Sequence, residues 1–330
     1  MARVVVTGGY GFIGSHLVTQ LLSRGDTVTV FDVARTPHDT SIDFDEHARF
    51  RFVAGDVTDY TALEEVLTPD VDLVYHLAAV VGIKSYVEDP LQVLDVNVTG
   101  TRHVLELSRR NGIRVLFSST SEIYGKNPET PFREGDDRIL GSTRTARWSY
   151  STSKAMAEHL CFAMHATYGL PVVVVRYFNV YGPRQNPIFV VSQSIQRVLN
   201  GLPPYLYDSG EQTRCFTHVD DAVRGTVLAA ESDVATGQAY NIGGMRETTM
   251  RDVVERVIHH AGVRLEPERV DTGAMYGKRY EDIPRRIPDS SKAQQELGWS
   301  LDIDIDEGIR RTLAWARDNP WYLKLGNPGG

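Results

Sequence analysis

Two hydrophobic patterns alternate along the first half of the chain. Short runs of β-branched and aromatic residues predict buried strands at residues 3–7, 27–32, 50–57, 73–78, 114–118 and 171–177. Between these runs, apolar residues recur at intervals of three and four and predict helices at residues 12–24, 58–67, 93–111 and 151–168. Strands that alternate with helices in this way indicate βαβ units, so we expect a parallel sheet with helices on both faces.

The pattern changes after about residue 180. Glycines and prolines punctuate residues 182–204 around a helix predicted at 190–199, and further helices are predicted at 219–231 and 250–261. The apolar stretch at residues 239–242 has the composition of one more strand of the first sheet. We therefore expect an α/β protein: residues 1–180 form a doubly wound parallel sheet, to which the strand near 239–242 returns, and residues 181–330 form mainly a smaller mixed α/β substrate lobe.

Composition and charge exclude several classes of protein. The 330 residues are 42% hydrophobic and 24% charged, as in ordinary globular proteins. The net charge of −8 and the lack of a basic run argue against a nucleic-acid partner. The two cysteines, Cys161 and Cys215, form no Cys/His cluster, so we expect neither a disulfide scaffold nor a metal site. No signal sequence or membrane span is apparent, and a cytoplasmic location is expected.

Three glycines, Gly8, Gly11 and Gly14, lie between the first predicted strand and the first predicted helix. Glycine at these positions allows a tight turn and lets backbone N–H groups approach a pyrophosphate at the helix N-terminus. Asp32 ends the second strand, where a carboxylate accepts hydrogen bonds from the adenosine ribose and repels a 2′-phosphate. This pattern predicts a Rossmann-type site that prefers NAD to NADP, whereas Arg35, just past that strand, is a residue type that suits NADP.

A second motif combines a tyrosine and a lysine one helical turn apart. Tyr150 and Lys154 are four residues apart, so they share one face of the predicted helix. A free tyrosine has a pKa of about 10, and a nearby ammonium together with a positive nicotinamide would favour its phenolate. The strand that precedes this helix ends in the hydroxyl-bearing residues Ser118, Ser119 and Thr120. The combination indicates oxidation or reduction of a hydroxyl group beside the dinucleotide.

Motifs along the whole chain resemble the NAD-dependent epimerase/dehydratase family, the extended short-chain dehydrogenases/reductases that act on nucleotide sugars. The matching motifs are TGGYGFIGSHL at residues 7–17, GDV at 55–57, HLAA at 76–79, YSTSK at 150–154, RYFNVYGPR at 176–184 and YNIGG at 240–244. The resemblance implies NAD as the cofactor and a UDP-sugar as the substrate. Besides the residues already named, it implies cofactor contacts from Phe12, Ile13, Asp56, Val57, Leu77, Ala78, Ala79, Ser119 and Tyr177.

The triplet Thr120-Ser121-Glu122 is informative within this family. UDP-glucuronate decarboxylases carry Thr-Ser-Glu, 4,6-dehydratases usually carry Thr-Asp-Glu, and sugar 4-epimerases usually lack the acid. Residues 139–150 and 276–288 are also similar to these decarboxylases. The resemblance therefore implies decarboxylation of UDP-glucuronic acid through a 4-keto intermediate, giving UDP-4-keto-pentose or UDP-xylose. A nucleotide-sugar 4,6-dehydratase, a 4-epimerase and a catalytically silent NAD-binding regulator are the alternatives.

The same resemblance implies roles for individual residues. Glu122, with Ser121 beside it, would be the acid/base at C5, and Arg286 would donate a proton or hold the sugar carboxylate. Thr120 and Tyr150 would form the oxyanion site. The residues expected to hold the UDP-sugar are Val81, Tyr86, Arg147, Asn179, Arg184, Tyr205, Arg214 and Tyr280.

Some of these residues also have simpler interpretations, and the sequence departs from the family pattern at two places. Arg286 could pair with Asp282 on the surface, and Arg147 could stack on Trp148. Tyr205 replaces a lysine expected to approach the nucleotide. The loop after residue 184 is shorter than in the subgroups that the chain resembles.

The helices predicted at 93–111 and 151–168 carry apolar residues beyond one core-facing stripe. These residues are Val93, Leu94, Val98, Val104, Leu105 and Leu107 in the first and Met156, Leu160, Phe162 and Met164 in the second. Proteins of the family that the chain resembles pair these two helices across a two-fold axis. We therefore expect a homodimer built on a four-helix bundle.

Overall fold

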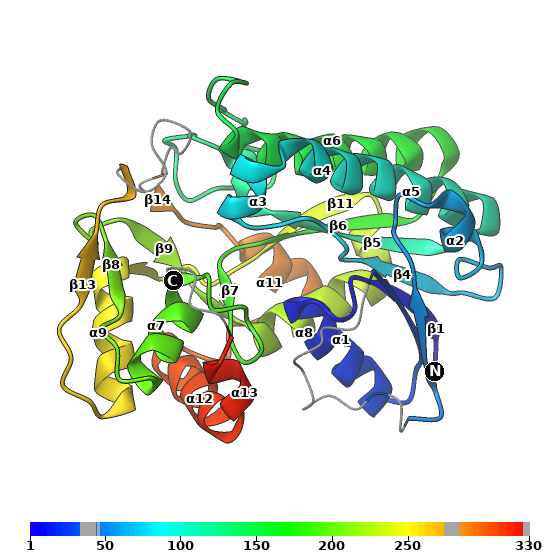
Figure 1. Ribbon diagram of the computed structural model, residues 1–330. Helices are drawn as coiled ribbons and strands as arrows, with labels where there is room; N and C mark the ends of the chain where they lie inside the picture. The colour runs from blue at the N-terminus through cyan, green and yellow to red at the C-terminus, as the bar shows by residue number, and fades with distance from the viewer. Residues whose placement is uncertain (34–43, 45–46, 274–282, 284, 326–330) are drawn as a thin grey trace.

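A computed structural model describes residues 1–33, 44, 47–273, 283 and 285–325 of the chain. Its centre is a seven-stranded sheet in the order β11-β6-β5-β4-β1-β2-β3, and every neighbouring pair in it is parallel (Figure 1). The strands are β1 (Arg3–Thr7), β2 (Thr27–Asp32), β3 (Phe50–Ala54), β4 (Leu73–His76), β5 (Arg114–Thr120), β6 (Val172–Tyr177) and β11 (Gln238–Ile242). The predicted doubly wound α/β fold is confirmed.

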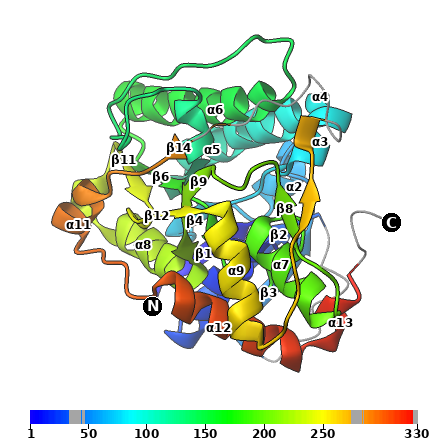
Figure 2. The same ribbon diagram turned by 90° about the vertical axis from the view of Figure 1, so that its left-hand side faces the viewer.

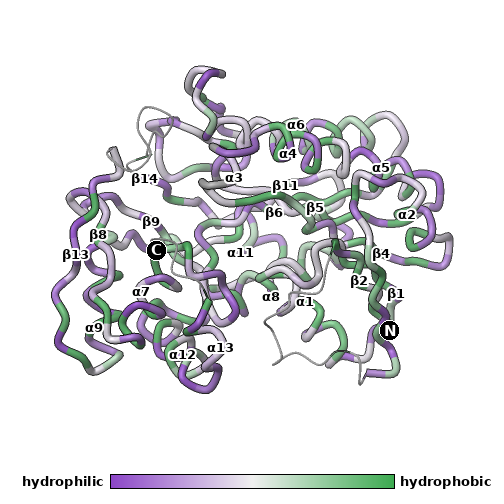
Figure 3. The backbone as a smooth tube through the Cα atoms, in the orientation of Figure 1, coloured by the Kyte–Doolittle hydropathy of each residue, from purple (hydrophilic) through white to green (hydrophobic). Residues whose placement is uncertain are grey.

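Helices cover both faces of this sheet, and a hydrophobic core fills each interface (Figure 1). One face carries α1 (Phe12–Ser23), α8 (Val219–Glu231) and α11 (Ser291–Leu297). The other face carries α2 (Tyr60–Glu64), α5 (Gly100–Asn111) and α6 (Arg147–Tyr168). Hydrophobic residues follow the strands between these layers, whereas hydrophilic residues lie mostly on the outer faces of the helices (Figure 3). The parallel strands are buried on both sides, which explains their near-continuous apolar sequences.

The helix predicted at residues 93–111 is three elements. The chain forms α4 (Pro90–Leu94), a π-helical turn η1 (Asp95–Thr99) and then α5, and the short α3 (Ile83–Glu88) precedes them. Asn97 lies in the π turn, where its Oδ1 accepts from Val80 N at 2.9 Å and its Nδ2 donates to Ser153 Oγ at 3.0 Å. The widened turn presents the Asn97 amide to two other segments, and apolar spacing alone contains no signal for this.

Other boundaries shift by a few residues. The strands predicted at 50–57 and 73–78 end at Ala54 and His76, whereas β5 continues to Thr120. Helix α6 begins at Arg147, four residues before the predicted start, because buried Arg147 and Trp148 extend its first turn into the protein. Tyr150 therefore lies within the first turn of α6, close to the end of β5.

The second lobe packs helices against small sheets of two or three strands, as Figure 2 shows. Its helices are α7 (Val190–Leu199), α9 (Met250–Ala261), α12 (Ile305–Asp318) and α13 (Pro320–Leu323). Its strands are β7 (Val180–Tyr181), β8 (Tyr205–Tyr207), β9 (Thr213–Cys215), β10 (Thr217–His218), β12 (Glu247–Thr249), β13 (Glu268–Val270) and β14 (Arg285–Arg286). The short turns η2 (Ser121–Tyr124) and η3 (Asp233–Ala235) complete the described elements. Within these described parts of the chain, no helix combines the length and apolar character needed to cross a bilayer.

Candidate active site

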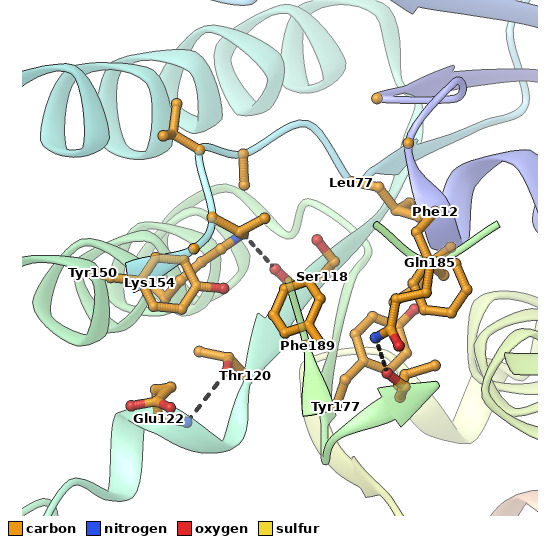
Figure 4. A pocket seen from close by; sticks show the side chains of 18 of the residues that line it. Phe12, Leu77, Ser118, Thr120, Glu122, Tyr150, Lys154, Tyr177, Gln185 and Phe189 are labelled. Atoms are coloured by element: carbon orange, nitrogen blue, oxygen red, sulfur yellow. Dashed lines mark hydrogen bonds between the residues drawn. The ribbon is translucent and has the colours of Figure 1, made fainter. Parts of the chain in front are cut away.

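A cavity of about 920 Å³ lies where the carboxyl ends of β1, β2, β4, β5 and β6 face the second lobe. In open α/β sheets ligands bind outside the carboxyl ends of the strands. Figure 4 shows Tyr150, Lys154, Thr120 and Glu122 on one side of this cavity, with Phe12, Leu77 and Tyr177 on the other. The volume suits an elongated ligand or two ligands placed end to end.

The glycine turn after β1 fits a dinucleotide. Gly8 has a φ of +72°, and a Cβ there would lie 2.7 Å from the backbone nitrogen of Ala78. A Cβ on Gly14 would collide with the carbonyl oxygen of Gly8. Gly11 is the N-cap of α1, and no side chain caps this end of the helix. Because the residues of the first turn line the cavity, the N-terminus of α1 is a suitable site for a phosphate. Only glycine leaves the backbone this close to a ligand.

Two carboxylates follow the glycine turn along the cavity. Asp32 accepts hydrogen bonds from Tyr10 N at 3.0 Å and from Val33 N at 2.8 Å, which places its carboxylate beside the glycine turn. Asp56 accepts from the backbone nitrogen of Thr58 at 2.8 Å. The other predicted cofactor residues that line the cavity are Phe12, Ile13, Val57, Leu77, Ala78, Ala79, Ser119 and Tyr177. The arrangement fits a dinucleotide with its ribose at Asp32, while Arg35 lies outside the described residues.

Tyr150 is buried, and its ring stacks on Tyr86 with the ring centroids 4.8 Å apart. Burial raises the pKa of the Tyr150 phenol well above its ordinary value, and the negative charge of Glu122 raises it further. A hydrogen bond with the Thr120 side chain and the charge of Arg286 act in the opposite direction. In the protein by itself the phenol is therefore protonated at neutral pH and can donate a hydrogen bond.

Lys154 is buried one turn further along α6. Its Nζ donates to the carbonyl oxygen of Ser118 at 2.8 Å (Figure 4). The same nitrogen lies 4.8 Å from the centre of the Phe117 ring. Burial lowers the pKa of Lys154 to about 8. The sequence predicted that this ammonium favours the Tyr150 phenolate. In the structure a hydrogen bond with Thr120 and the charge of Arg286 also act to lower the pKa of Tyr150, and the effect of the Lys154 ammonium stays a prediction.

Glu122 connects two arginines that are far apart in the sequence. Arg147 Nη2 donates to both carboxylate oxygens of Glu122, at 3.2 and 3.1 Å, and Arg286 Nη1 donates to Oε1. Burial raises the pKa of Glu122, but Arg286, Arg147 and Arg214 outweigh it and hold the pKa at about 2. Glu122 is therefore a carboxylate at neutral pH, which suits a base or a charge partner better than a proton donor.

The simpler interpretations of these arginines have different outcomes. Arg286 pairs with Glu122, and its proposed surface partner Asp282 lies outside the described residues. Arg147 lies beside Trp148, with the guanidinium 5.7 Å from the ring centroid, and contacts Glu122 as well.

The structure brings most of the expected substrate residues together. Val81, Tyr86, Arg147, Asn179 and Arg214 line the cavity, as do the triplet residues Thr120, Ser121 and Glu122 and the distant Arg286.

Two expected substrate residues, Arg184 and Tyr205, are not among the described residues that line the cavity. Arg184 Nη1 lies 3.4 Å from the hydroxyl of Thr19 on α1. The Arg197 guanidinium lies 3.6 Å from the centre of the Tyr205 ring and covers it. Tyr280 lies outside the described residues.

Sequence reasoning missed the part of the cavity that the second lobe contributes. Its lining residues include Gln185, Ile188, Phe189, Tyr207, Gln212, Phe216, Met250 and Thr272. Tyr207 lies two residues after Tyr205 on the same face of β8, and it lines the cavity, whereas Tyr205 is not among the described lining residues. The Tyr207 hydroxyl donates to Gln193 Oε1 at 2.9 Å. The aromatic pair in YLY was a usable signal, but the sequence does not say which tyrosine Arg197 covers.

Comparison with known proteins places the chain in a family. Residues 5–312 match the GDP-mannose 4,6 dehydratase family, and the chain belongs to this family of NAD-dependent epimerases and dehydratases. A UDP-N-acetyl-alpha-D-glucosaminuronate decarboxylase of Bacillus cytotoxicus is 34% identical over 324 residues, which are 96% of this chain and 98% of that protein. UDP-glucuronic acid decarboxylase 1 of Arabidopsis thaliana is 35% identical over 94% of this chain and 69% of that protein.

A crystal structure shares the fold. UDP-glucuronic acid 4-epimerase from Bacillus cereus, solved with UDP-glucuronic acid and NAD, superposes with a TM-score of 0.84 at 29% identity. The match covers 96% of this chain and 99% of that one. NAD is the cofactor of the family to which the chain belongs, and the glycine turn and Asp32 fit it.

Proposed function

We propose that this protein is an NAD-dependent decarboxylase of UDP-glucuronic acid. The observation that carries the proposal is the cluster of Glu122, Arg147 and Arg286 beside the Tyr150 hydroxyl. Arginine binds a carboxylate through two parallel hydrogen bonds, and this cluster places two buried arginines at the cavity. The two decarboxylase relatives support the proposal, and so does the epimerase that binds UDP-glucuronic acid.

The proposed substrate complex uses both parts of the chain. Residues 1–180, with β11, hold NAD through the glycine turn, Asp32 and Asp56, while residues 181–330 contribute mainly to the nucleotide-sugar site. When bound, NAD accepts a hydride from C4 of the sugar, and its positive ring favours the deprotonated form of the nearby phenol. Arg214, Tyr207 and Gln212 face the cavity from the second lobe and are proposed to contact the UDP moiety.

Tyr150 is the proposed base for the first step and takes the proton of the C4 hydroxyl. Thr120 hydrogen-bonds with the Tyr150 side chain and aligns it toward the substrate oxygen. Lys154 holds the end of β5 through its hydrogen bond to Ser118 and supplies a positive charge on the same face of α6. Oxidation at C4 needs these groups, whichever change follows at C5.

The product of this step is a sugar with a ketone at C4 and a carboxylate on C5, which is a β-keto acid. The bond from C5 to the carboxylate breaks, carbon dioxide leaves, and the electron pair moves into the C4 carbonyl to give an enolate. Thr120 and Tyr150 can donate hydrogen bonds to the enolate oxygen. Arg286 is proposed to hold the carboxylate before it leaves, and Glu122, through water, to control the proton that returns to C5.

Two products are compatible with this site. Return of the hydride to C4 gives UDP-xylose, whereas early release of the ketone gives UDP-4-keto-pentose. A 4-epimerase or a 4,6-dehydratase would use the same first oxidation and then change a different bond. Tyr150, Lys154 and Glu122 line one cavity, which argues against a catalytically silent NAD-binding regulator.

The test uses UDP-glucuronic acid labelled with ¹³C at the carboxyl carbon, with NAD and the full chain. We expect ¹³C-labelled carbon dioxide and a UDP-pentose product by mass spectrometry. UDP-N-acetylglucosaminuronic acid in a parallel reaction shows which C2 substituent is preferred, and Arg286→Ala serves as the inactive control. If the product is UDP-galacturonic acid and no carbon dioxide is released, the protein is a 4-epimerase, and the decarboxylase proposal is wrong.

We also propose a homodimer, although fewer of the predicted interface residues are available for it. The structure buries four of the predicted residues, Val93, Val104, Leu105 and Leu107, inside the chain, so they cannot contribute to an interface. Leu94 on α4 and Met156 on α6 stay exposed, and these two helices lie side by side (Figure 1). Two copies of this face would form a self-complementary bundle of four helices.

A further inference from the structure

A buried carboxylate lies behind the cavity wall. Glu158 is on α6, one turn after Lys154, and only 5% of its surface is exposed. Arg176 on β6 donates from Nε to Oε1 at 3.0 Å and from Nη2 to Oε2 at 2.6 Å. The hydroxyl of Ser119 on β5 donates to Oε1 as well. Glu158 therefore accepts three hydrogen bonds, from Arg176 and Ser119, and none of the steps described above uses it.

This carboxylate is connected to Lys154 in two ways. The two residues are four positions apart on α6 and share one face of the helix. Glu158 also accepts from Ser119, the residue next to Ser118, whose carbonyl oxygen holds the Lys154 ammonium. One carboxylate thus acts on the lysine through its charge and fixes the strand segment on which the lysine rests.

The charges around Lys154 can be followed element by element. On α6, Cys161 and Glu158 act to raise the pKa of Lys154, against the larger effect of burial. Burial raises the pKa of the Cys161 thiol far above neutrality, so that thiol is uncharged and has little effect. On β4, burial and the charge of Lys154 lower the pKa of His76 to about 3, which leaves the imidazole neutral.

Among the residues that the structure describes, the other groups that contact Lys154 are uncharged. Strand β5 presents the Phe117 ring and the Ser118 carbonyl, and the phenol of Tyr150 is protonated in the protein by itself. Arg176 faces Glu158 from β6 and partly balances its charge. Among the described groups that act on Lys154, the carboxylate is Glu158.

We propose that Glu158 is a positioning residue for C4 oxidation, because its carboxylate holds Ser119 and thereby fixes the end of β5, where the Ser118 carbonyl accepts the hydrogen bond of Lys154. The inference rests on the role proposed above for Tyr150 and Lys154, and it is independent of what happens at C5. An ammonium at this position is what a phenolate at Tyr150 requires in the reaction. Glu158 itself touches neither the reacting atoms nor the cavity.

The experiment measures the titration of Lys154 directly. The chain has six lysines, so ¹³C NMR of protein labelled at lysine Cε gives few signals, and Lys154→Met assigns the one of interest. In Glu158→Gln we expect the pKa of Lys154 to fall by at least about one pH unit, the usual effect of losing one nearby opposite charge. The alkaline limb of the turnover profile should move to lower pH by the same amount.

Two control variants separate this effect from simple loss of structure. Glu158→Asp keeps the carboxylate, so the pKa of Lys154 in this variant should stay close to the wild-type value. Arg176→Lys disturbs the paired hydrogen bonds but keeps both charges. It should therefore lower the melting temperature without lowering the pKa of Lys154. Should Glu158→Gln fail to fold, Glu158→Gln combined with Arg176→Met removes both charges together, a change that buried ion pairs often tolerate. Because Arg176 partly balances the charge of Glu158, this double variant should show a smaller fall of the Lys154 pKa in the same direction.

An unchanged Lys154 titration in Glu158→Gln, or in the double variant, would overturn the inference. A fall of equal size in Arg176→Lys would also overturn it, since the effect would then come from packing. The titration is read without any turnover. A protein that shows the expected fall but releases no carbon dioxide from UDP-glucuronic acid would therefore refute only the proposed decarboxylase function.

Discussion

Glu122→Gln should tighten the binding of UDP-glucuronic acid while it slows the reaction. In the structure Glu122 accepts hydrogen bonds from Arg147 and Arg286, the same groups that are proposed to face the sugar carboxylate. A substrate carboxylate must therefore share these arginines with an internal one of the same charge. Glutamine keeps the size of the side chain and removes the charge, so the arginines become available to the substrate.

The pKa of Glu122 gives the scale of the effect. It falls from 4.5 to about 2, which corresponds to about 3 kcal/mol of net favourable interaction at roughly 1.36 kcal/mol for each pKa unit. If the substrate carboxylate gains a third to a half of that interaction, its binding improves by about 1 to 1.5 kcal/mol, or roughly 5- to 12-fold in Kd. Product formation should fall by about two orders of magnitude, the usual effect of losing one acid–base group.

Calorimetry with UDP-glucuronic acid and with UDP-glucose, in the presence of NAD, measures the binding. We expect tighter binding of the acid alone, because UDP-glucose has no carboxylate to offer. Glu268→Gln is the matched control: Glu268 pairs with Arg197, and neither is among the described residues that line the cavity. Weaker binding of UDP-glucuronic acid to Glu122→Gln, in a variant with a normal melting curve, would refute the competition argument.

Three further predictions concern the base, the cofactor and the assembly. Tyr150→Phe removes one hydroxyl from a buried ring and should abolish sugar oxidation, while thermal stability and NAD affinity stay near wild type; near-normal turnover would show that another group is the base. Asp32→Ala should lower the affinity of the protein for NAD at least about tenfold and reduce its preference for NAD over NADP, as measured by fluorescence titration. An unchanged preference would show that other groups set it. Met156→Glu should convert a dimer into a monomer by light scattering, because it places a charge on the exposed face of α6; a wild-type monomer at micromolar concentration would refute the dimer itself.

Local patterns were sufficient to predict the sheet and the cofactor end of the cavity. The alternation of strands and helices predicted the parallel sheet, and the spacing of Gly8, Gly11 and Gly14 placed the turn that β1 and α1 now frame. Tyr150 and Lys154 needed only the helical repeat. Each of these signals lies within a few residues of chain, where backbone geometry and side-chain spacing are directly linked.

The features that sequence missed depend on contacts between distant segments. Arg286 meets Glu122 across 164 positions, and no local pattern says that the pair forms. The π turn at Asn97 follows from partners on two other segments, Val80 and Ser153. Arg197 covers Tyr205 only because α7 and β8 pack together in the second lobe. Tertiary context decides such positions, so composition and periodicity cannot.

The position of β11 at the edge of the sheet has a consequence for the synthesis of the protein. The chain completes β6, with the sequence VVVVRY, long before the ribosome reaches β11, its neighbour in the finished sheet. During this interval a row of unpaired N–H and C=O groups borders four consecutive valines, which is the kind of edge that pairs with other chains. Newly made protein is therefore most exposed to aggregation between Tyr177 and Ile242, and a fragment that stops near residue 180 should be insoluble. Slow translation or low chaperone levels should lower the yield of this protein, because they lengthen the time for which the edge at β6 is unpaired.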